Sequence, residues 1–375
     1  MTMKSMAFAA VAMIGAMAAT AAAPPAPAPS LKDAYRGIFH VGVAMNMKQI
    51  LGLDPHGRAI VRDEFDSISP ENDLKWERIH PLPDTYDFGV PDRYVAFGEK
   101  NRMYVVGHVL VWHDQTPAWV FEDGHGHPQT RDGLLQRMRE HIFAVVGRYK
   151  GRVKAWDVVN EALNEDGSMR QSPWYRIVGP DYIAKAFEYA HEADPQAELI
   201  YNDYNIESGK KLEGAVALIR KLKAEGVPVT TVGIQGHYRL DWPDASSLDK
   251  AIAAFAGLGV KVAITELDID VLPQATATQT AEVTLSVAGN PALDPYAKGL
   301  PDAVQAQLTQ RYADIFKVCL KHKDAVDRIT VWGVGDKDSW KNDWPVKGRT
   351  NYPLLFDRAG NPKPAVAAIV EAAGK

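Results

Sequence analysis

The stretch VKAWDVVNE, residues 153–161, holds the pattern that decides the fold. Residues 153–159 form a short apolar run with three valines and a tryptophan, which is typical of a buried strand. Just upstream, Gly151 is a typical helix end. The residues before it repeat at the spacing of one helix face: Leu134, Met138, Ile142, Val145 and Tyr149. An amphipathic helix, a turn and a buried strand are therefore predicted here, and the strand leads into the polar pair Asn160 and Glu161.

The same alternation extends in both directions along the chain. Eight runs are predicted as strands: Ile38–Met45, Phe65–Ser69, Tyr104–Val111, Val153–Val159, Glu198–Tyr204, Thr231–Gly236, Lys261–Leu267 and Arg328–Val334. Strands that alternate with helices imply a parallel sheet with right-handed crossovers. Eight units favour a closed (β/α)8 barrel, an α/β fold. The rival is an open doubly wound sheet, which usually has a Gly-rich phosphate turn after its first strand, and Gly37 and Gly42 do not form one.

Composition limits the classes of function. The chain has 375 residues, 46% of them hydrophobic, and a formal net charge of -5. A mildly acidic balance argues against nucleic acid as the main partner, which would need a basic face, so no nucleic-acid partner is expected. The single cysteine, Cys319, excludes an intrachain disulfide and a cysteine-based metal site, and its place on a helical apolar stripe predicts a buried thiol.

The N-terminus has the features of a signal peptide. Lys4 precedes an Ala-rich apolar stretch that ends in small residues, with Ala-x-Ala sites near position 23. Residues 1–23 are therefore expected to be removed, and the Pro/Ala-rich residues 24–30 to be a spacer. A single folded domain over residues 31–375 is expected, secreted or periplasmic, monomeric and without stable insertion in a membrane. The irregular stretch 273–301, which follows the seventh strand, is expected to be functional or mobile.

Polar and aromatic side chains follow nearly every predicted strand. In barrel enzymes the active site lies at the carboxyl ends of the strands, so these side chains are expected to share one rim. They are, in chain order, Glu71, Asn72, Lys75, His108, Trp112, Gln115, Asn160, Glu161, Tyr204, Gln235, His237, Glu266, Asp268, Trp332 and Trp340.

Two glutamates in this set suggest a reaction. Glu161 and Glu266 follow the fourth and seventh strands, nearly opposite each other across a barrel. Glycoside cleavage needs one protonated carboxyl to assist the leaving oxygen and one carboxylate to attack the anomeric carbon, about 5–5.5 Å apart in retaining enzymes. The rival interpretation is that the two glutamates are strand-end acids that form salt bridges and have no catalytic role.

Several motifs resemble those of glycoside hydrolase family 10. The matching segments are Ser69–Lys75 (SPENDLK), Gly107–His113 (GHVLVWH), Trp156–Glu161 (WDVVNE), Gly233–His237 (GIQGH), Ile264–Asp268 (ITELD) and the Trp332-Gly-Val run. The resemblance implies a (β/α)8 barrel that cleaves xylan and xylo-oligosaccharides as a retaining endo-β-1,4-xylanase, without a cofactor. Val109, Gly335 and Lys337 depart from the family pattern and leave the fine specificity open.

The resemblance also implies roles for individual residues. Glu161 matches the acid/base and Glu266 the nucleophile. His237 matches the residue that hydrogen-bonds the nucleophile, with Asp268 as its partner, and Asn160 matches the amide at the sugar 2-hydroxyl. Gln115 and Trp340 resemble positions that crowd the C6 carbon of a glucosyl unit, and Tyr204 is expected on the aglycone side. The remaining binding positions match the glycone side: Glu71, Asn72, Lys75, His108, Trp112 and Trp332; Gln235 is also expected to bind substrate.

Three other functions remain as alternatives. A metal-dependent barrel hydrolase would need a ligand cluster, and the pair His125 and His127 has the spacing but lies in an exposed-looking loop. A non-catalytic carbohydrate-binding barrel would be expected to lack one of the two glutamates. A β-1,4-glucanase, or an enzyme of mixed specificity, would use the same fold and catalytic pair.

Overall fold

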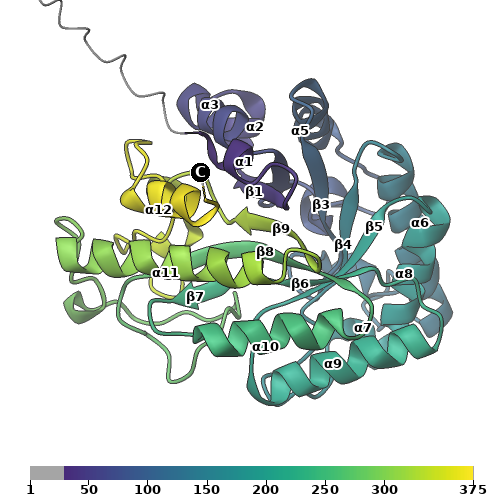
Figure 1. Cartoon of the computed structure of the whole chain (residues 1–375). Helices are drawn as coiled ribbons and strands as arrows, with labels where there is room; N and C mark the ends of the chain where they lie inside the picture. The colour runs from purple at the N-terminus through teal and green to yellow at the C-terminus, as the bar shows by residue number, and fades with distance from the viewer. Residues whose placement is uncertain (1–28, 375) are drawn as a thin grey trace, which may run out of the picture.

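The computed structural model describes residues 29–374, so the predicted signal peptide and most of the spacer lie outside the described residues. Within that range the strands form one sheet around a common axis (Figure 1). The strands are β1 (His40–Met45), β2 (Ser67–Pro70), β3 (Tyr104–Val111), β4 (Ala155–Asn160), β5 (Glu198–Asp203), β6 (Thr231–Ile234), β7 (His237–Arg239), β8 (Lys261–Asp270) and β9 (Val326–Val331).

The sheet closes on itself and is parallel throughout. Its strand order is β6-β5-β4-β3-β2-β1-β9-β8, and a further pairing of β6 with β8 completes the ring, with Val232 opposite Val262. Each of the eight predicted strands overlaps one of these eight, which confirms the (β/α)8 barrel. The short strand β7, which pairs with the end of β8, was not predicted.

Three strands end two or three residues away from their predicted ends. The run ending at Gly236 stops at Ile234, because Gly236 has a φ of +85° and turns the chain before β7 begins. The strand predicted to end at Leu267 continues to Asp270, since β7 gives it a partner. The last strand ends at Val331, two residues before Gly333, whose φ is +132°.

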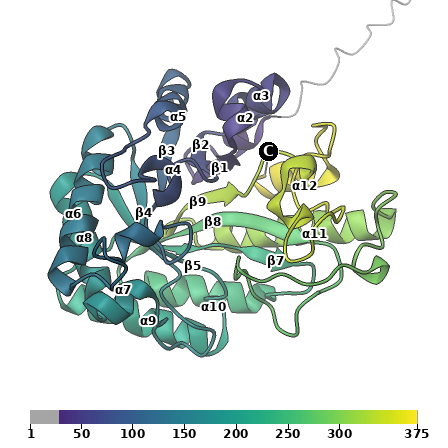
Figure 2. The ribbon, with the colours of Figure 1, turned by 180° about the vertical axis from the view of Figure 1, so that it is seen from behind.

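Helices surround the barrel, as Figures 1 and 2 show from opposite sides. They are α1 (Leu31–Ala34), α2 (Met47–Leu51), α3 (Pro55–Glu64), α4 (Trp76–Ile79), α5 (Gly89–Lys100), α6 (Arg131–Arg148), α7 (Pro173–Val178), α8 (Tyr182–Ala193), α9 (Gly209–Ala224), α10 (Ala245–Ala256), α11 (Asp302–Lys321) and α12 (Pro364–Ala372). Short 3-10 turns lie at Ala118–Val120, Pro291–Leu293, Asp336–Asp338 and Trp340–Asn342.

Helix α6 shows how sequence sets these elements. It begins after Thr130, whose side-chain oxygen accepts a hydrogen bond from the Gly133 amide and satisfies a free donor of the first turn. The helix ends before Gly151, which has a φ of +72°. The five residues predicted to share one face are all fully buried. Burying that stripe against the barrel is what stabilises the helix.

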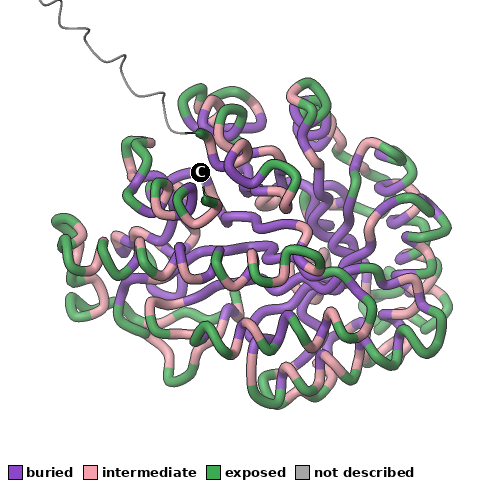
Figure 3. The backbone as a smooth tube through the Cα atoms, viewed as in Figure 1, coloured by how far each residue is buried: buried purple, intermediate pink, exposed green. Residues whose placement is uncertain are grey.

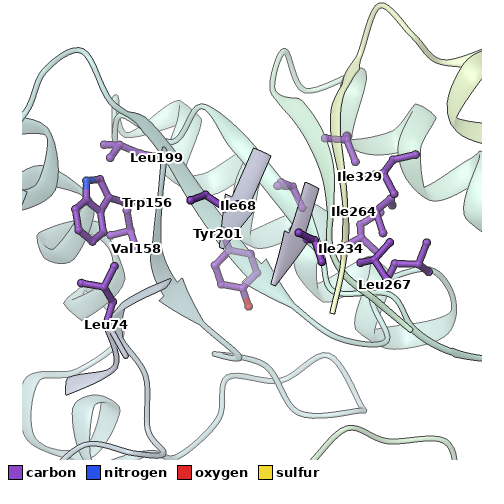
Figure 4. Packing of buried hydrophobic residues seen from close by; sticks show 14 of the residues in the cluster. Ile68, Leu74, Trp156, Val158, Leu199, Tyr201, Ile234, Ile264, Leu267 and Ile329 are labelled. Carbon is purple, nitrogen blue, oxygen red and sulfur yellow. The ribbon is translucent and has the colours of Figure 1, made fainter. Parts of the chain in front are cut away.

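The core lies between the barrel and the helices, and buried residues follow the strands in Figure 3. Figure 4 shows neighbouring strands filling it, with Trp156 and Val158 of β4 beside Leu199 of β5. Trp156 needs a glycine on the adjacent strand: a Cβ at Gly107 would lie 2.1 Å from its ring. Cys319 is fully buried on α11, as predicted.

The carboxyl ends of the strands open toward the long segments that connect them to the next helices. The longest of these is segment 273–301, which follows β8 and contains only one short 3-10 turn, so the irregular structure predicted there is confirmed. Among the described helices, none is long and apolar enough to cross a bilayer.

Candidate active site

A cavity with about 580 Å³ of empty space lies at the carboxyl end of the barrel. Thirteen of the fifteen residues predicted at this rim line it: Glu71, Asn72, Lys75, His108, Trp112, Gln115, Asn160, Glu161, Gln235, His237, Glu266, Trp332 and Trp340. Segment 273–301 adds Ala281 and Val283, which no sequence pattern singled out. The structure therefore brings both glutamates into one cavity.

Glu161 lies directly after β4 in a left-handed backbone conformation, with a φ of +57°. Such a conformation costs on the order of 1–3 kcal/mol for a residue other than glycine and marks a site where the surroundings hold the backbone. Its carboxyl accepts hydrogen bonds from Gln235 at 2.9 Å, Asn160 at 3.0 Å and Trp112 at 2.9 Å. Burial, together with the nearby charge of Asp203, raises the pKa of Glu161 to about 7 despite these donors.

Glu266 lies within β8, and its surroundings favour the ionised carboxylate, in contrast to those of Glu161. Its carboxylate accepts a 2.8 Å hydrogen bond from Asn202 Nδ2, and His237 Nε2 lies 3.2 Å from its second oxygen. Burial favours the neutral acid, but the hydrogen bond from His237 and the positive potential of His108 outweigh it and lower the pKa of Glu266. At neutral pH Glu266 is therefore ionised, whereas Glu161 holds its proton for part of the time.

His237 connects Glu266 to Asp268. Its Nδ1 lies 3.1 Å from Asp268 Oδ1, and Trp340 Nε1 donates to the other oxygen of Asp268 at 2.7 Å. Burial opposes protonation of His237, yet the charges of Asp268 and Glu266 raise its pKa to about 9. The predicted partnership of His237 with Asp268 is present in the structure, and it keeps a cationic donor facing Glu266.

The two halves of the site are joined by Asn202, which the sequence analysis did not select. Asn202 Nδ2 donates to Asn160 Oδ1 at 2.9 Å as well as to Glu266. Gln235 Nε2 also reaches Asn160 Oδ1, at 3.1 Å. A continuous set of amide side chains thus runs from Glu161 to Glu266. The only sequence signal for Asn202 was its place at the end of a predicted strand.

Lys75 organises one wall of the cavity. Its ammonium group donates to Asn72 Oδ1 at 2.8 Å and Gln115 Oε1 at 2.7 Å, and lies 5.0 Å from the ring centre of Trp112. Close by, burial raises the pKa of Glu71 to about 7. Hydrogen-bonding groups beside indole faces match the alternating hydroxyl and C–H surfaces of a sugar.

Tyr204 does not line this cavity, although it was predicted to bind substrate. It is 2% exposed, its hydroxyl accepts a 3.0 Å hydrogen bond from Arg170, and Lys211 lies 3.4 Å from its ring centre. These contacts occupy the side chain within the protein. Asp268 is the second predicted residue that does not line the cavity. It is fully buried behind His237.

One group of potential metal ligands occurs among the described residues, formed by His113, Asp114 and Glu282. Arg170 already contacts Glu282, with Nη1 2.6 Å from Oε2, and a guanidinium beside the carboxylate disfavours a cation there. His125 and His127, the pair weighed for a metal site, lie in an exposed loop where His127 pairs with Asp123.

A closed (β/α)8 barrel with one proton-retaining and one ionised carboxyl in a polar, tryptophan-walled cavity has the catalytic groups that a glycoside hydrolase needs. The chain belongs to glycosyl hydrolase family 10, whose family model matches residues 30–372.

Named relatives agree with this family. The chain is 45% identical to endo-1,4-beta-xylanase A of Xylanibacter ruminicola, over 92% of this chain and 93% of that protein. It is also 45% identical to the beta-1,4-xylanase of Dictyoglomus thermophilum, over 92% and 91%. A solved family 10 endoxylanase from a sugarcane soil metagenome superposes with a TM-score of 0.89 and 47% identity, covering 91% of this chain and 99% of that one.

Proposed function

We propose that this chain is a retaining endo-1,4-β-xylanase with Glu161 as acid/base and Glu266 as nucleophile. The observation that supports it most strongly is the opposite electrostatic setting of two carboxyls in one cavity. The pKa of Glu161 is raised to about 7 and that of Glu266 is lowered. Retaining cleavage needs this difference, because the acid must bring a proton and the nucleophile must not carry one.

In the first step Glu266 attacks the anomeric carbon of the bound sugar while the bond to the leaving oxygen breaks. Glu161 gives its proton to that oxygen, so the leaving chain departs as a neutral alcohol. The products of this step are a glycosyl ester on Glu266 and an ionised Glu161. The cation on His237 lowers the cost of presenting an unprotonated Glu266 inside a buried cavity.

In the second step the ionised Glu161 takes a proton from a water molecule that attacks the same carbon. The ester bond to Glu266 breaks, and both side chains return to their starting protonation states. Two inversions at one carbon give net retention. Asn160 and Asn202 hold the two carboxyls through shared hydrogen bonds. We expect Asn160 to contact the sugar 2-hydroxyl, where a contact strengthens as positive charge develops.

Xylan is the substrate that the relatives' names and the cavity support. Both named relatives are xylanases, and Gln115 and Trp340 line the cavity at positions expected to crowd the C6 carbon that xylose lacks. Initial rates on xylan and carboxymethylcellulose separate this specificity from a β-1,4-glucanase. We expect a large preference for xylan; comparable rates would disprove that preference, and loss of activity in EDTA would favour the metal-dependent alternative.

The apolar N-terminus supports export, and we include it in the proposal. Residues 1–23 would direct the chain to the periplasm or the medium and be removed, leaving residues 31–375 as one monomeric catalytic domain after a short spacer. Intact mass of the protein purified from the producing cells tests the cleavage site. Light scattering of the same sample tests the monomer.

A further inference from the structure

Arg170 lies outside the predicted site but contacts three segments that meet beside it. Its Nε donates to the backbone carbonyl of Glu161 at 3.0 Å, and its Nη2 donates to the Tyr204 hydroxyl at 3.0 Å. Its Nη1 lies 2.6 Å from Glu282 of segment 273–301. The side chains of Arg170 and Glu282 are only 16% and 20% exposed, so water screens this ion pair less than one on the open surface.

Arg170 contacts the backbone of Glu161 at a point where the backbone conformation is strained. With its φ of +57°, Glu161 depends on its neighbours to keep its carboxyl directed into the cavity. Its amide donates to Asn202 O at 2.9 Å, and its carbonyl accepts from Arg170. Arg170 is itself fixed, because its own amide donates to Ala162 O at 2.7 Å across a tight loop closed by a bridge between Leu163 and Met169.

The contact with Glu282 joins the acid/base to one wall of the cavity. Ala281 and Val283, on either side of Glu282, both line that cavity. Burial opposes ionisation of Glu282, but the hydrogen bond from Arg170 lowers its pKa, so the ion pair persists at neutral pH. The other titratable groups near the pair are Tyr204, His113, Asp114 and Lys211. His113 has a pKa lowered to about 4 by burial and by Arg170, so it is neutral and does not compete for Glu282.

We propose that Arg170 is a positioning residue for the reaction. It links the backbone of Glu161 to the side chain of Glu282, so that the proton donor and the cavity wall formed by residues 281–283 are held in a fixed position relative to each other. This inference rests on the proposed function. Arg170 acts through Glu161 and is not itself in contact with the reacting atoms. Its guanidinium suits the task because a planar fork can hold a carbonyl, a hydroxyl and a carboxylate at once, which an ammonium group cannot reproduce.

The test compares R170K and E282Q with the wild-type enzyme on two classes of substrate. Xylo-oligosaccharides need protonation of a poor leaving group, whereas aryl β-xylobiosides with an acidic phenol do not. We expect R170K to lower kcat/KM on xylo-oligosaccharides by on the order of 10- to 100-fold and on the activated aryl substrate by much less. E282Q should show the same pattern more weakly, with a raised KM for longer oligosaccharides.

R139Q is the matched control, because it removes an arginine–carboxylate pair with Glu192 on the outside of α6 and α8. It should leave both rates unchanged. Equal losses on the two substrates in R170K and E282Q would overturn the positioning role, and if R170K does not fold, E282Q alone decides by the same criterion. Failure of the wild-type enzyme to cleave xylo-oligosaccharides would instead overturn the proposed function itself.

Discussion

His237 faces Glu266 across 3.2 Å, and the pKa of this histidine is raised to about 9. Burial disfavours any charge on either side chain, yet the pair is stable in its ionised form because Asp268 supports the histidine from the other side. The site thus stabilises a carboxylate in a place where burial alone would have protonated it. Much of the catalytic chemistry that we propose depends on this arrangement.

Replacing His237 should therefore move the acidic limb of the pH profile. In H237N the nucleophile loses a cationic hydrogen-bond donor, the pKa of Glu266 rises, and the acidic limb of kcat/KM shifts to higher pH by about one unit or more. D268N should shift it in the same direction and by less, since His237 remains. An acidic limb that stays in place in H237N would show that His237 does not control the ionisation of Glu266.

Removing the acid should slow the cleavage of substrates with poor leaving groups much more than that of substrates with good leaving groups. E161Q is expected to lower kcat/KM on xylo-oligosaccharides by about 10²- to 10⁴-fold, and much less on aryl xylobiosides that leave without a proton. E266Q is the comparison variant and should abolish turnover of both, since no glycosyl ester can form. Steady-state rates on the two substrates measure the difference; equal losses in E161Q would exclude Glu161 as the acid.

The alkaline limb should follow the titration of Glu161. Only the protonated form can assist the leaving group, and the pKa of this carboxyl is about 7. We expect kcat/KM on xylo-oligosaccharides to fall above about pH 7, by about tenfold for each further unit. With an activated aryl substrate, kcat/KM should fall much less above pH 7. An equally steep fall on both substrates would show that a group other than Glu161 controls the alkaline limb.

The packing of Gly107 against Trp156 gives a prediction about stability. A methyl group at position 107 would overlap the indole, so G107A should destabilise the fold by about 1–3 kcal/mol or more. G147A is the control: this glycine lies within α6 with open space around its Cβ position, and the change should stabilise by about 0.5–1 kcal/mol. Urea unfolding measures both, and similar stabilities for the two variants would contradict the packing.

The barrel and most of its cavity could be predicted from the sequence because both depend on local patterns. Strand and helix periodicity gave the alternating elements, and the carboxyl ends of parallel strands meet at one rim. The strand ends were harder to place, because glycines such as Gly236 and Gly333 set them through positive φ angles and because β7 lengthens β8 by pairing with it.

The residues of the site that were not predicted have positions that depend on long-range contacts rather than on a local sequence pattern. Asn202 shares its strand end with Asp203 and Tyr204, and only the register of the closed barrel decides which of them faces the glutamates. Arg170 contacts Glu161 from the far side of a tight loop, and Ala281 and Val283 come from a segment without periodicity. The absence of Tyr204 from the cavity lining could not be predicted for the same reason, since its contacts with Arg170 and Lys211 are long-range.

The most direct test of the central claim is the anomeric configuration of the first products. Proton NMR of a xylo-oligosaccharide digest, recorded in the first minutes before mutarotation, distinguishes the two outcomes. If Glu266 forms a glycosyl ester that Glu161 helps water to cleave, the new reducing end appears first as the β-anomer. Initial release of the α-anomer would show a single inverting displacement and would contradict the roles proposed for both glutamates.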